Sequence, residues 1–186
     1  FLRLSAPRYL RPDMERFWGL DRTILSSAIN GMIDYLYTSH KHLIENLNIP
    51  RIKGSLRDLA DSVGRKLNLN DPSECFCFGF IDGTFRRIAR PVQYQRVAYS
   101  GHHRAHGLRY QGVVCPSGII ESLFGPIEGR HHDKWVLDES KILETLENAG
   151  FKDEETGSTF YVYGDAAYPL HPNLLSPIPS LKLSTI

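Results

Sequence analysis

The chain has 186 residues, 41% of them hydrophobic and 23% charged, with a formal net charge of +1. This composition is ordinary for a globular protein of one domain with a small addition, and it excludes a disordered chain. No run approaches the roughly 18 consecutive apolar residues of a membrane span, and no secretory signal peptide is visible. The first residue is Phe1 rather than Met, so we expect a fragment of a longer protein.

The first part of the chain has the pattern of helices. Apolar residues recur near helical spacing between residues 24 and 47, and Asp21 is placed as their N-cap. A second helical stretch follows Ser55, its expected cap. We therefore predict a helical N-terminal region over residues 1–72 and a separate domain over residues 73–186.

Two later strands each lead into a carboxylate. In FCFGFIDGTFRR, alternating phenylalanines run into Asp82, which is typical of a strand over residues 76–88. In FYVYGDAAY, a short strand over residues 160–163 is followed by Asp165. Such strands supply rigid positions for hard oxygen ligands, which suits a Mg²⁺ or Mn²⁺ site for phosphoryl transfer. The alternative is that each Asp merely caps the turn after its strand.

A hairpin and a helix are predicted between these two strands. Residues 108–115 and 119–124 flank Pro-Ser-Gly, a turn signal. Residues 134–149 form an amphipathic stripe that Gly150 would end. The order is then three strands, a helix and a strand, preceded by helices, which predicts an α/β fold.

A basic segment follows Asp82 directly. Residues 83–120 contain no Asp or Glu, and tyrosines are interleaved with the arginines, a composition that suits a phosphate backbone. The alternative is that the arginines pair with the acid-rich residues 133–155. The predicted DNA-contacting residues are Arg86, Arg87, Arg90, Arg96, Arg104 and Arg109.

The histidines and cysteines are candidate zinc ligands by residue type. His102, His103 and His106 form one group, and His131, His132 and Asp133 another. The cysteine pair has C-x-C rather than C-x₂-C spacing, with no partner pair, so we expect no zinc site. The three cysteines are an odd number without a disulfide framework, which favours a reducing compartment.

Six motifs in order carry a family resemblance. They are FIDGT, RP, YSGHHRAH, VVCPSGII, GRHHD and YGDAAYPL, over roughly residues 78–178. Together they resemble the transposase-derived DDE superfamily endonucleases of the Harbinger (PIF) type. The resemblance implies a ribonuclease-H-like core, with the first Asp on the first strand, the second after the fourth, and the two strands adjacent. It also implies a helix-turn-helix-like region before the nuclease, with weaker motif support.

The implied catalytic residues are Asp82 and Asp165, as ligands of Mg²⁺ or Mn²⁺ in two-metal DNA cleavage and strand transfer. The family's triad ends in a Glu on a later helix, but no Asp or Glu follows Asp165 here. Glu121 and Asp133 are the nearest alternatives, and for Asp133 helix capping or structural hydrogen bonding is favoured over a place in the metal site. We therefore expect a truncated nuclease domain that is inactive or weakened.

The alternative is a non-catalytic DNA-binding or protein-interaction module derived from a transposase. The expected partner is double-stranded DNA, without a membrane, and either a homo-oligomer or a separate DNA-binding protein is compatible with the sequence. A nuclear location follows only from the need to reach DNA, with the cytoplasm as the alternative.

Overall fold

A computed structural model describes residues 11–177 of the chain. Contacts between residues divide the chain into two compact units, Phe1–His42 and Leu43–Ile186, and each is described by itself. The expected domain boundary between residues 72 and 73 stays a prediction. Within the described residues, no helix is long and apolar enough to cross a membrane.

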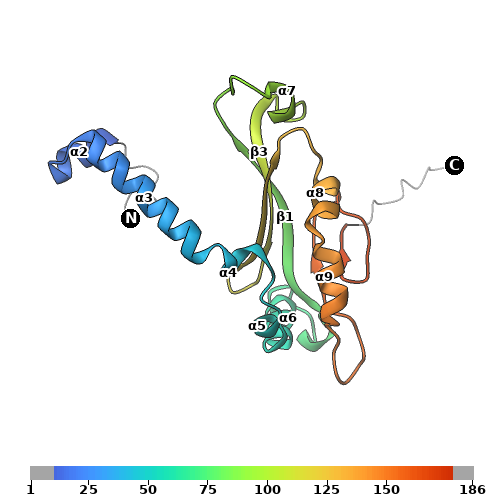
Figure 1. The fold of residues 1–186 in the computed structure, drawn as a ribbon. Coiled ribbons are helices and arrows are strands. Elements are labelled where there is room, and N and C mark those ends of the chain that lie inside the picture. The colour runs from blue at the N-terminus through green and yellow to red at the C-terminus, as the bar shows by residue number, and fades with distance from the viewer. Residues whose placement is uncertain (1–10, 178–186) are drawn as a thin grey trace. The chain divides into compact units, whose positions relative to one another are not determined.

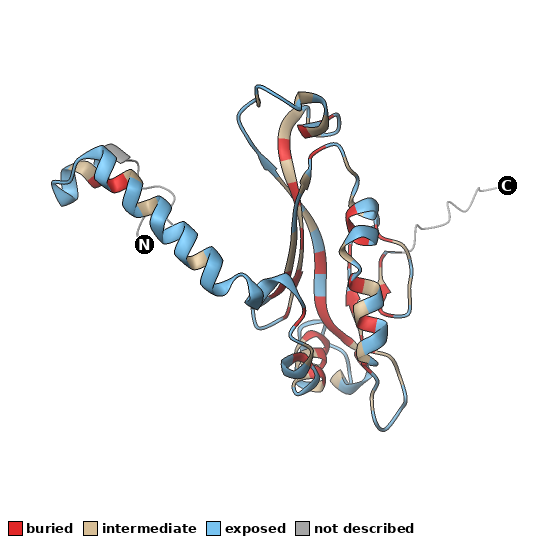
Figure 2. Cartoon of the chain, viewed as in Figure 1, coloured by how far each residue is buried: buried red, intermediate tan, exposed pale blue. Residues whose placement is uncertain are grey.

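The first unit contains the helices α2 (Arg11–Trp18) and α3 (Arg22–His40). The start of α3 is as expected, because the Asp21 carboxylate accepts a hydrogen bond from the Thr23 N–H at 2.7 Å. Most of α3 is exposed along its length, with Leu25 its buried residue (Figure 2). The helical N-terminal region is therefore present, while its likeness to a helix-turn-helix stays a prediction.

Short helices lead into the sheet of the second unit. They are α4 (His42–Glu45), α5 (Ile49–Lys53), α6 (Leu56–Lys66) and the 3₁₀ turn η1 (Pro72–Glu74). Ser55 occupies the N-cap position of α6, as expected, but its hydroxyl donates to the Arg51 carbonyl at 3.0 Å instead of capping the helix.

The described residues of this unit form a six-stranded mixed sheet in the order β2-β3-β1-β5-β6, with β4 paired to β3 (Figure 1). The strands are β1 (Cys77–Arg87), β2 (Tyr99–Ser100), β3 (Ala105–Val114), β4 (Ile120–Glu128), β5 (Tyr161–Tyr163) and β6 (Leu174–Leu175). A short helix, α7 (Gln95–Ala98), precedes β2. The sequence pattern did not predict α7, β2 or β6, which have two to four residues each.

The directions of the strands agree with the expected fold. β1 runs antiparallel to β3, β3 antiparallel to β4, and β1 parallel to β5. The predicted hairpin is confirmed, since β3 and β4 pair around the turn at Pro116–Gly118. Three antiparallel strands followed by helices and a parallel strand beside the first give the predicted ribonuclease-H-like α/β core.

The predicted helix over residues 134–149 is two helices, α8 (Asp133–Ser140) and α9 (Ile142–Ala149), which lie end to end in Figure 1. The chain breaks at Lys141, whose φ of 55° is left-handed. The Ser140 hydroxyl accepts from the Gln111 side chain at 2.9 Å, which ties the break to β3. Gly150 ends α9 in the left-handed conformation, as predicted.

One apolar core joins the sheet to the helices around it. Its buried members include Phe78 and Val162 of the sheet, Leu137 of α8 and Leu146 of α9. Phe78 is fully buried, whereas Phe80, on the same strand, is 43% exposed. The alternation that predicted a buried strand therefore holds for Phe78 and not for Phe80.

Candidate active site

Of the two predicted carboxylates, Asp82 lies within β1 and Asp165 follows the parallel neighbour β5. Phe80 of β1 is paired with Tyr163 of β5, and each acid follows its member of this pair by two residues. Adjacent strands are about 4.8 Å apart, so Asp82 in β1 lies near the end of β5, where the chain turns at Asp165. Both residues are exposed.

A turn that begins at Asp165 fixes its carboxylate. The Gly164 N–H donates to the Leu175 carbonyl at 2.9 Å. This hydrogen bond extends the contact with β6 one residue beyond the end of β5. The Asp165 Oδ1 accepts from the Ala167 N–H at 2.9 Å, and its carbonyl accepts from the Tyr168 N–H at 3.2 Å. The capping role that the sequence left open is therefore present in Asp165, and it occupies Oδ1.

Asp133 begins α8 and is paired with an arginine. Its Oδ1 lies 2.7 Å from Nη1 of Arg109, which comes from the middle of β3. The Arg109 guanidinium also lies 5.7 Å from the centre of the Phe85 ring. Arg109 is only 6% exposed, and its guanidinium is paired with Asp133 instead of being open to a phosphate. We therefore correct its prediction as a DNA contact. Asp133 makes the structural interaction that the sequence favoured for it.

Gly83 lets these groups approach β1. A side-chain carbon at Gly83 would lie 2.6 Å from Oδ1 of Asp133 and 3.6 Å from the hydroxyl oxygen of Tyr168. The first distance is shorter than a carbon and an oxygen that are not bonded can approach. Residue 83 therefore has no room for a side chain, which explains the glycine after Asp82.

Tyr168 is a residue of this site that the sequence did not single out. It is 4% exposed, and its ring packs so closely on Gly164 that a side-chain carbon there would lie 2.8 Å from it. Its buried hydroxyl has no hydrogen-bond partner among residues 11–177. Burial raises the pKa of this hydroxyl above its ordinary value, and the negative charges of three carboxylates raise it further. In descending order of effect they are Asp133, Asp82 and Asp165.

The described residues contain no group of three or more His, Cys, Asp or Glu side chains that could hold a metal ion together. The other candidate acid, Glu121, is 4% exposed and forms an ion pair with Arg51. It therefore joins β4 to α5 and lies apart from the carboxylate pair.

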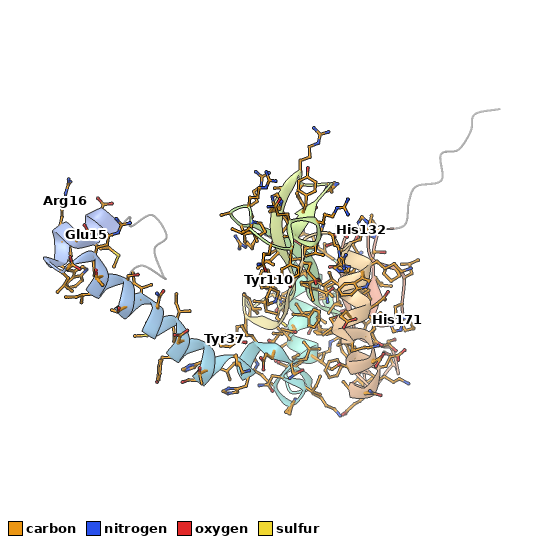
Figure 3. All side chains as sticks on the ribbon, turned by 45° about the horizontal axis from the view of Figure 1, so that its top comes forward. Glu15, Arg16, Tyr37, Tyr110, His132 and His171 are labelled. Carbon is orange, nitrogen blue, oxygen red and sulfur yellow. The ribbon has the colours of Figure 1, made fainter. Side chains whose placement is uncertain are left out.

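Five of the six predicted DNA-contacting arginines are exposed: Arg86, Arg87, Arg90, Arg96 and Arg104. Figure 3 shows nitrogen-tipped side chains gathered around the start of β3 and α7. Within residues 11–177, none of the five forms an ion pair with an acid of α8 or α9. Glu144 pairs with Lys141 and Glu147 with His171 instead. Arg90 is hydrogen bonded to the Gln95 side chain at 2.7 and 2.9 Å.

The histidines are held by aromatic contacts. The His103 ring stacks on Phe85 with centres 4.2 Å apart, and His131 stacks on Trp135 at 3.7 Å. His132 is the N-cap residue of α8 and is labelled in Figure 3. The cysteines Cys75, Cys77 and Cys115 are all free and buried.

The comparison with known families agrees with this arrangement. The family described as DDE superfamily endonuclease matches residues 81–184, more than half of the chain. The chain belongs to this family, a class of transposase-type endonuclease domains. No curated protein and no solved structure gives a significant match.

Proposed function

We propose that the chain is a Harbinger-type nuclease domain acting on double-stranded DNA, in which Asp82 and Asp165 hold a divalent metal ion. The observation that carries this proposal is the parallel pairing of β1 and β5, because Asp82 lies in β1 and Asp165 follows the end of β5 by two residues. Mg²⁺ is bound in proteins by one or two carboxylates and keeps several of its waters. The donor set is therefore suited to Mg²⁺ or Mn²⁺.

The rest of the site agrees with a two-carboxylate metal centre. Asp133 is engaged by Arg109, so its Oδ1 is not offered to an ion. A bound ion would supply Lewis-acid stabilisation of a reacting phosphodiester.

DNA is the proposed partner because the exposed arginines lack acidic partners within the described chain. Arginine binds phosphate oxygens with charge-assisted, often bidentate hydrogen bonds. The arginines at the end of β1, Arg86 and Arg87, follow Asp82 by four and five residues. A nuclear location would follow from action on chromosomal DNA.

The cleavage activity of the 186-residue chain is proposed to be weak. No acid follows Asp165, and the two other nearby candidates are engaged, Glu121 by Arg51 and Asp133 by Arg109. A supercoiled plasmid incubated with Mg²⁺ or Mn²⁺ should show little nicking. Strong nicking that disappears in Asp82→Ala would contradict the weak-activity proposal and support the metal site.

The alternative, a non-catalytic DNA-binding or interaction module, is favoured by the lack of a three-acid cluster in the described residues. Isothermal titration with Mn²⁺ separates the two functions. We expect binding by the natural chain, its loss in Asp82→Ala and Asp165→Ala, and no change in Asp138→Ala, an exposed acid on α8. If all three variants retained binding, Asp82 and Asp165 would not be the metal ligands, and the non-catalytic module would be the remaining function.

A further inference from the structure

The loop between β1 and α7 presents two apolar side chains to solvent. Val92 is 93% exposed and Tyr94 is 79% exposed, the highest fractions among the large hydrophobic side chains that the structure describes. Single exposed apolar residues are common on protein surfaces, so exposure by itself does not mark a binding site. The backbone and the charges around Tyr94 distinguish it from such residues.

The backbone at Tyr94 has the left-handed conformation, with a φ of 58°. Residues other than glycine adopt this conformation rarely, and for a bulky side chain it is an outlier. The Tyr94 carbonyl is held there, because it accepts hydrogen bonds from the N–H groups of Val97 and Ala98 at 3.1 and 3.2 Å. Unfavourable conformations of this kind persist at functional sites, where the surrounding structure fixes the position of a side chain.

Two further contacts order the loop and the helix α7 that follows it. The Arg90 guanidinium donates two hydrogen bonds to Oε1 of Gln95, at 2.7 and 2.9 Å, and so closes the loop. The Arg130 N–H donates to the Val97 carbonyl at 3.2 Å, which ties α7 to the chain after β4. The exposed Tyr94 ring is therefore carried on an ordered backbone, so a ligand that binds it causes little further loss of conformational entropy.

The surroundings of Tyr94 are basic. Residues 83–120 contain no acid, and the exposed Arg90 and Arg96 lie before and after Tyr94 in the chain. Arginines bind phosphates, whereas an aromatic ring stacks on a base. The bases of a duplex are covered by their neighbours, so a ring on the protein surface reaches only a base that is unpaired or has left the stack.

We propose that Tyr94 stacks on an unpaired base of the DNA, so that the loop between β1 and α7 recognises DNA whose strands are locally separated. This inference rests on the proposed function, because it requires DNA at the exposed arginines. It narrows the substrate from double-stranded DNA in general to a duplex that contains unpaired bases.

The test compares a fully paired duplex with a duplex of the same length that carries a short internal run of mismatched pairs. In fluorescence anisotropy, the natural chain should bind the mismatched duplex roughly tenfold more tightly, about the contribution of one stacked base. Tyr94→Ala should lose this preference and bind the two duplexes alike. Tyr94→Phe keeps the ring and should retain the preference.

Val92→Ala is the matched control, since Val92 lies on the same loop, is exposed and has no ring. It should retain the preference of the natural chain. Because Tyr94→Ala removes no charge, it should also leave the salt dependence of duplex binding unchanged. A 2-aminopurine among the mismatched bases reports stacking directly: its fluorescence should fall on binding of the natural chain and of Tyr94→Phe, but not of Tyr94→Ala.

The outcomes are distinguishable. Equal affinities of the natural chain for the two duplexes, or a preference that Tyr94→Ala retains, overturn the role of Tyr94 and leave DNA as the proposed partner. Loss of the preference in Tyr94→Phe or in Val92→Ala overturns stacking by the ring, in favour of a hydroxyl contact or of an apolar wedge formed by the loop. Binding to neither duplex overturns the proposed DNA partner, and with it this inference.

Discussion

Beside Asp82, the strand carries a glycine whose missing side chain makes room for Asp133 and Tyr168. Gly83→Ala would set a carbon 2.6 Å from Oδ1 of Asp133, which must then move. We expect a loss of about 1 to 3 kcal/mol in the free energy of unfolding, the usual cost of overpacking. Gly112→Ala is the control, because its added carbon would meet atoms only at 3.9 Å. Urea unfolding that gives equal losses for the two variants would contradict the close approach.

The ion pair between Arg109 and Asp133 makes a second prediction at the level of residues. Arg109→Ala leaves a partly buried carboxylate without its partner, so the free energy of unfolding should fall by about 2 to 3 kcal/mol. The exposed Arg86→Ala should change it by less than about 0.5 kcal/mol. Chemical denaturation followed by circular dichroism measures both. If Arg109→Ala weakened DNA binding without loss of stability, its assignment to the interior would be wrong.

Burial also raises the pKa of two cysteine thiols. It raises the pKa of Cys77 to about 11 and that of Cys115 to about 12, from 9.0 for an ordinary thiol. Both thiols should therefore resist iodoacetamide at about pH 8 in the folded chain and react in urea, as counted by mass spectrometry. Because the unfolded thiols ionise first, the free energy of unfolding should fall as the pH rises from about 9 toward 11. Equal labelling rates in the folded and unfolded chain would contradict this.

At the level of elements, two of the phenylalanines of β1 lie in different environments. Phe78 is fully buried in the core and packs edge-on against Phe151, whereas Phe80 is 43% exposed. Phe78→Ala should cost about 3 to 5 kcal/mol of the free energy of unfolding, because it opens a cavity. Phe80→Ala on the same strand should cost far less. Thermal unfolding in which the two variants have the same melting temperature would mean that the burial of β1 is misassigned.

The regular elements near the site could be predicted because their patterns are local. Alternation predicted β1, the Pro-Ser-Gly turn predicted the hairpin, and Gly150 predicted the end of α9. The break at Lys141 could not be predicted, because it depends on a hydrogen bond from Gln111 on a distant strand. The strands β2 and β6 are held by pairing with their neighbours and have too few residues for a period of their own.

At the level of the whole molecule, the sequence predicted the two strands that carry or precede the acids, and the structure pairs β1, which contains Asp82, in parallel with β5, which precedes Asp165. The contacts of Arg109 and Tyr168 could not be predicted. Arg109 stands in a basic segment whose other arginines are exposed, and only the fold brings it to Asp133, 24 residues away. Tyr168 follows Asp165 by three residues and resembles an ordinary turn residue in the sequence, and only the fold shows that its side chain is buried beside Gly83 and Gly164.

The exposed arginines predict how DNA affinity depends on salt. Binding to each phosphate releases counterions. A plot of the logarithm of the DNA affinity against the logarithm of the salt concentration therefore has a negative slope, and each phosphate that the protein neutralises adds about 0.9 to its magnitude. The double variant Arg86→Ala/Arg87→Ala should therefore reduce the slope by about 2, if each side chain binds one phosphate. Arg65→Ala, an exposed arginine on α6, is the control and should leave the slope unchanged. Fluorescence anisotropy with a DNA duplex gives the slopes, and unchanged values in the double variant would remove these arginines from the interface.

The most direct test of the metal site is to cut the chain at the site itself. Fe²⁺ loaded in place of Mg²⁺, with ascorbate and peroxide, generates radicals that cleave the backbone near the bound ion. We predict fragments that end near residues 82 and 165, two positions 83 residues apart in sequence that the sheet brings together. Mg²⁺ in excess should suppress both cuts, and Asp82→Ala should abolish both. Cleavage elsewhere, or at one of the two positions alone, would contradict a metal site shared by Asp82 and Asp165.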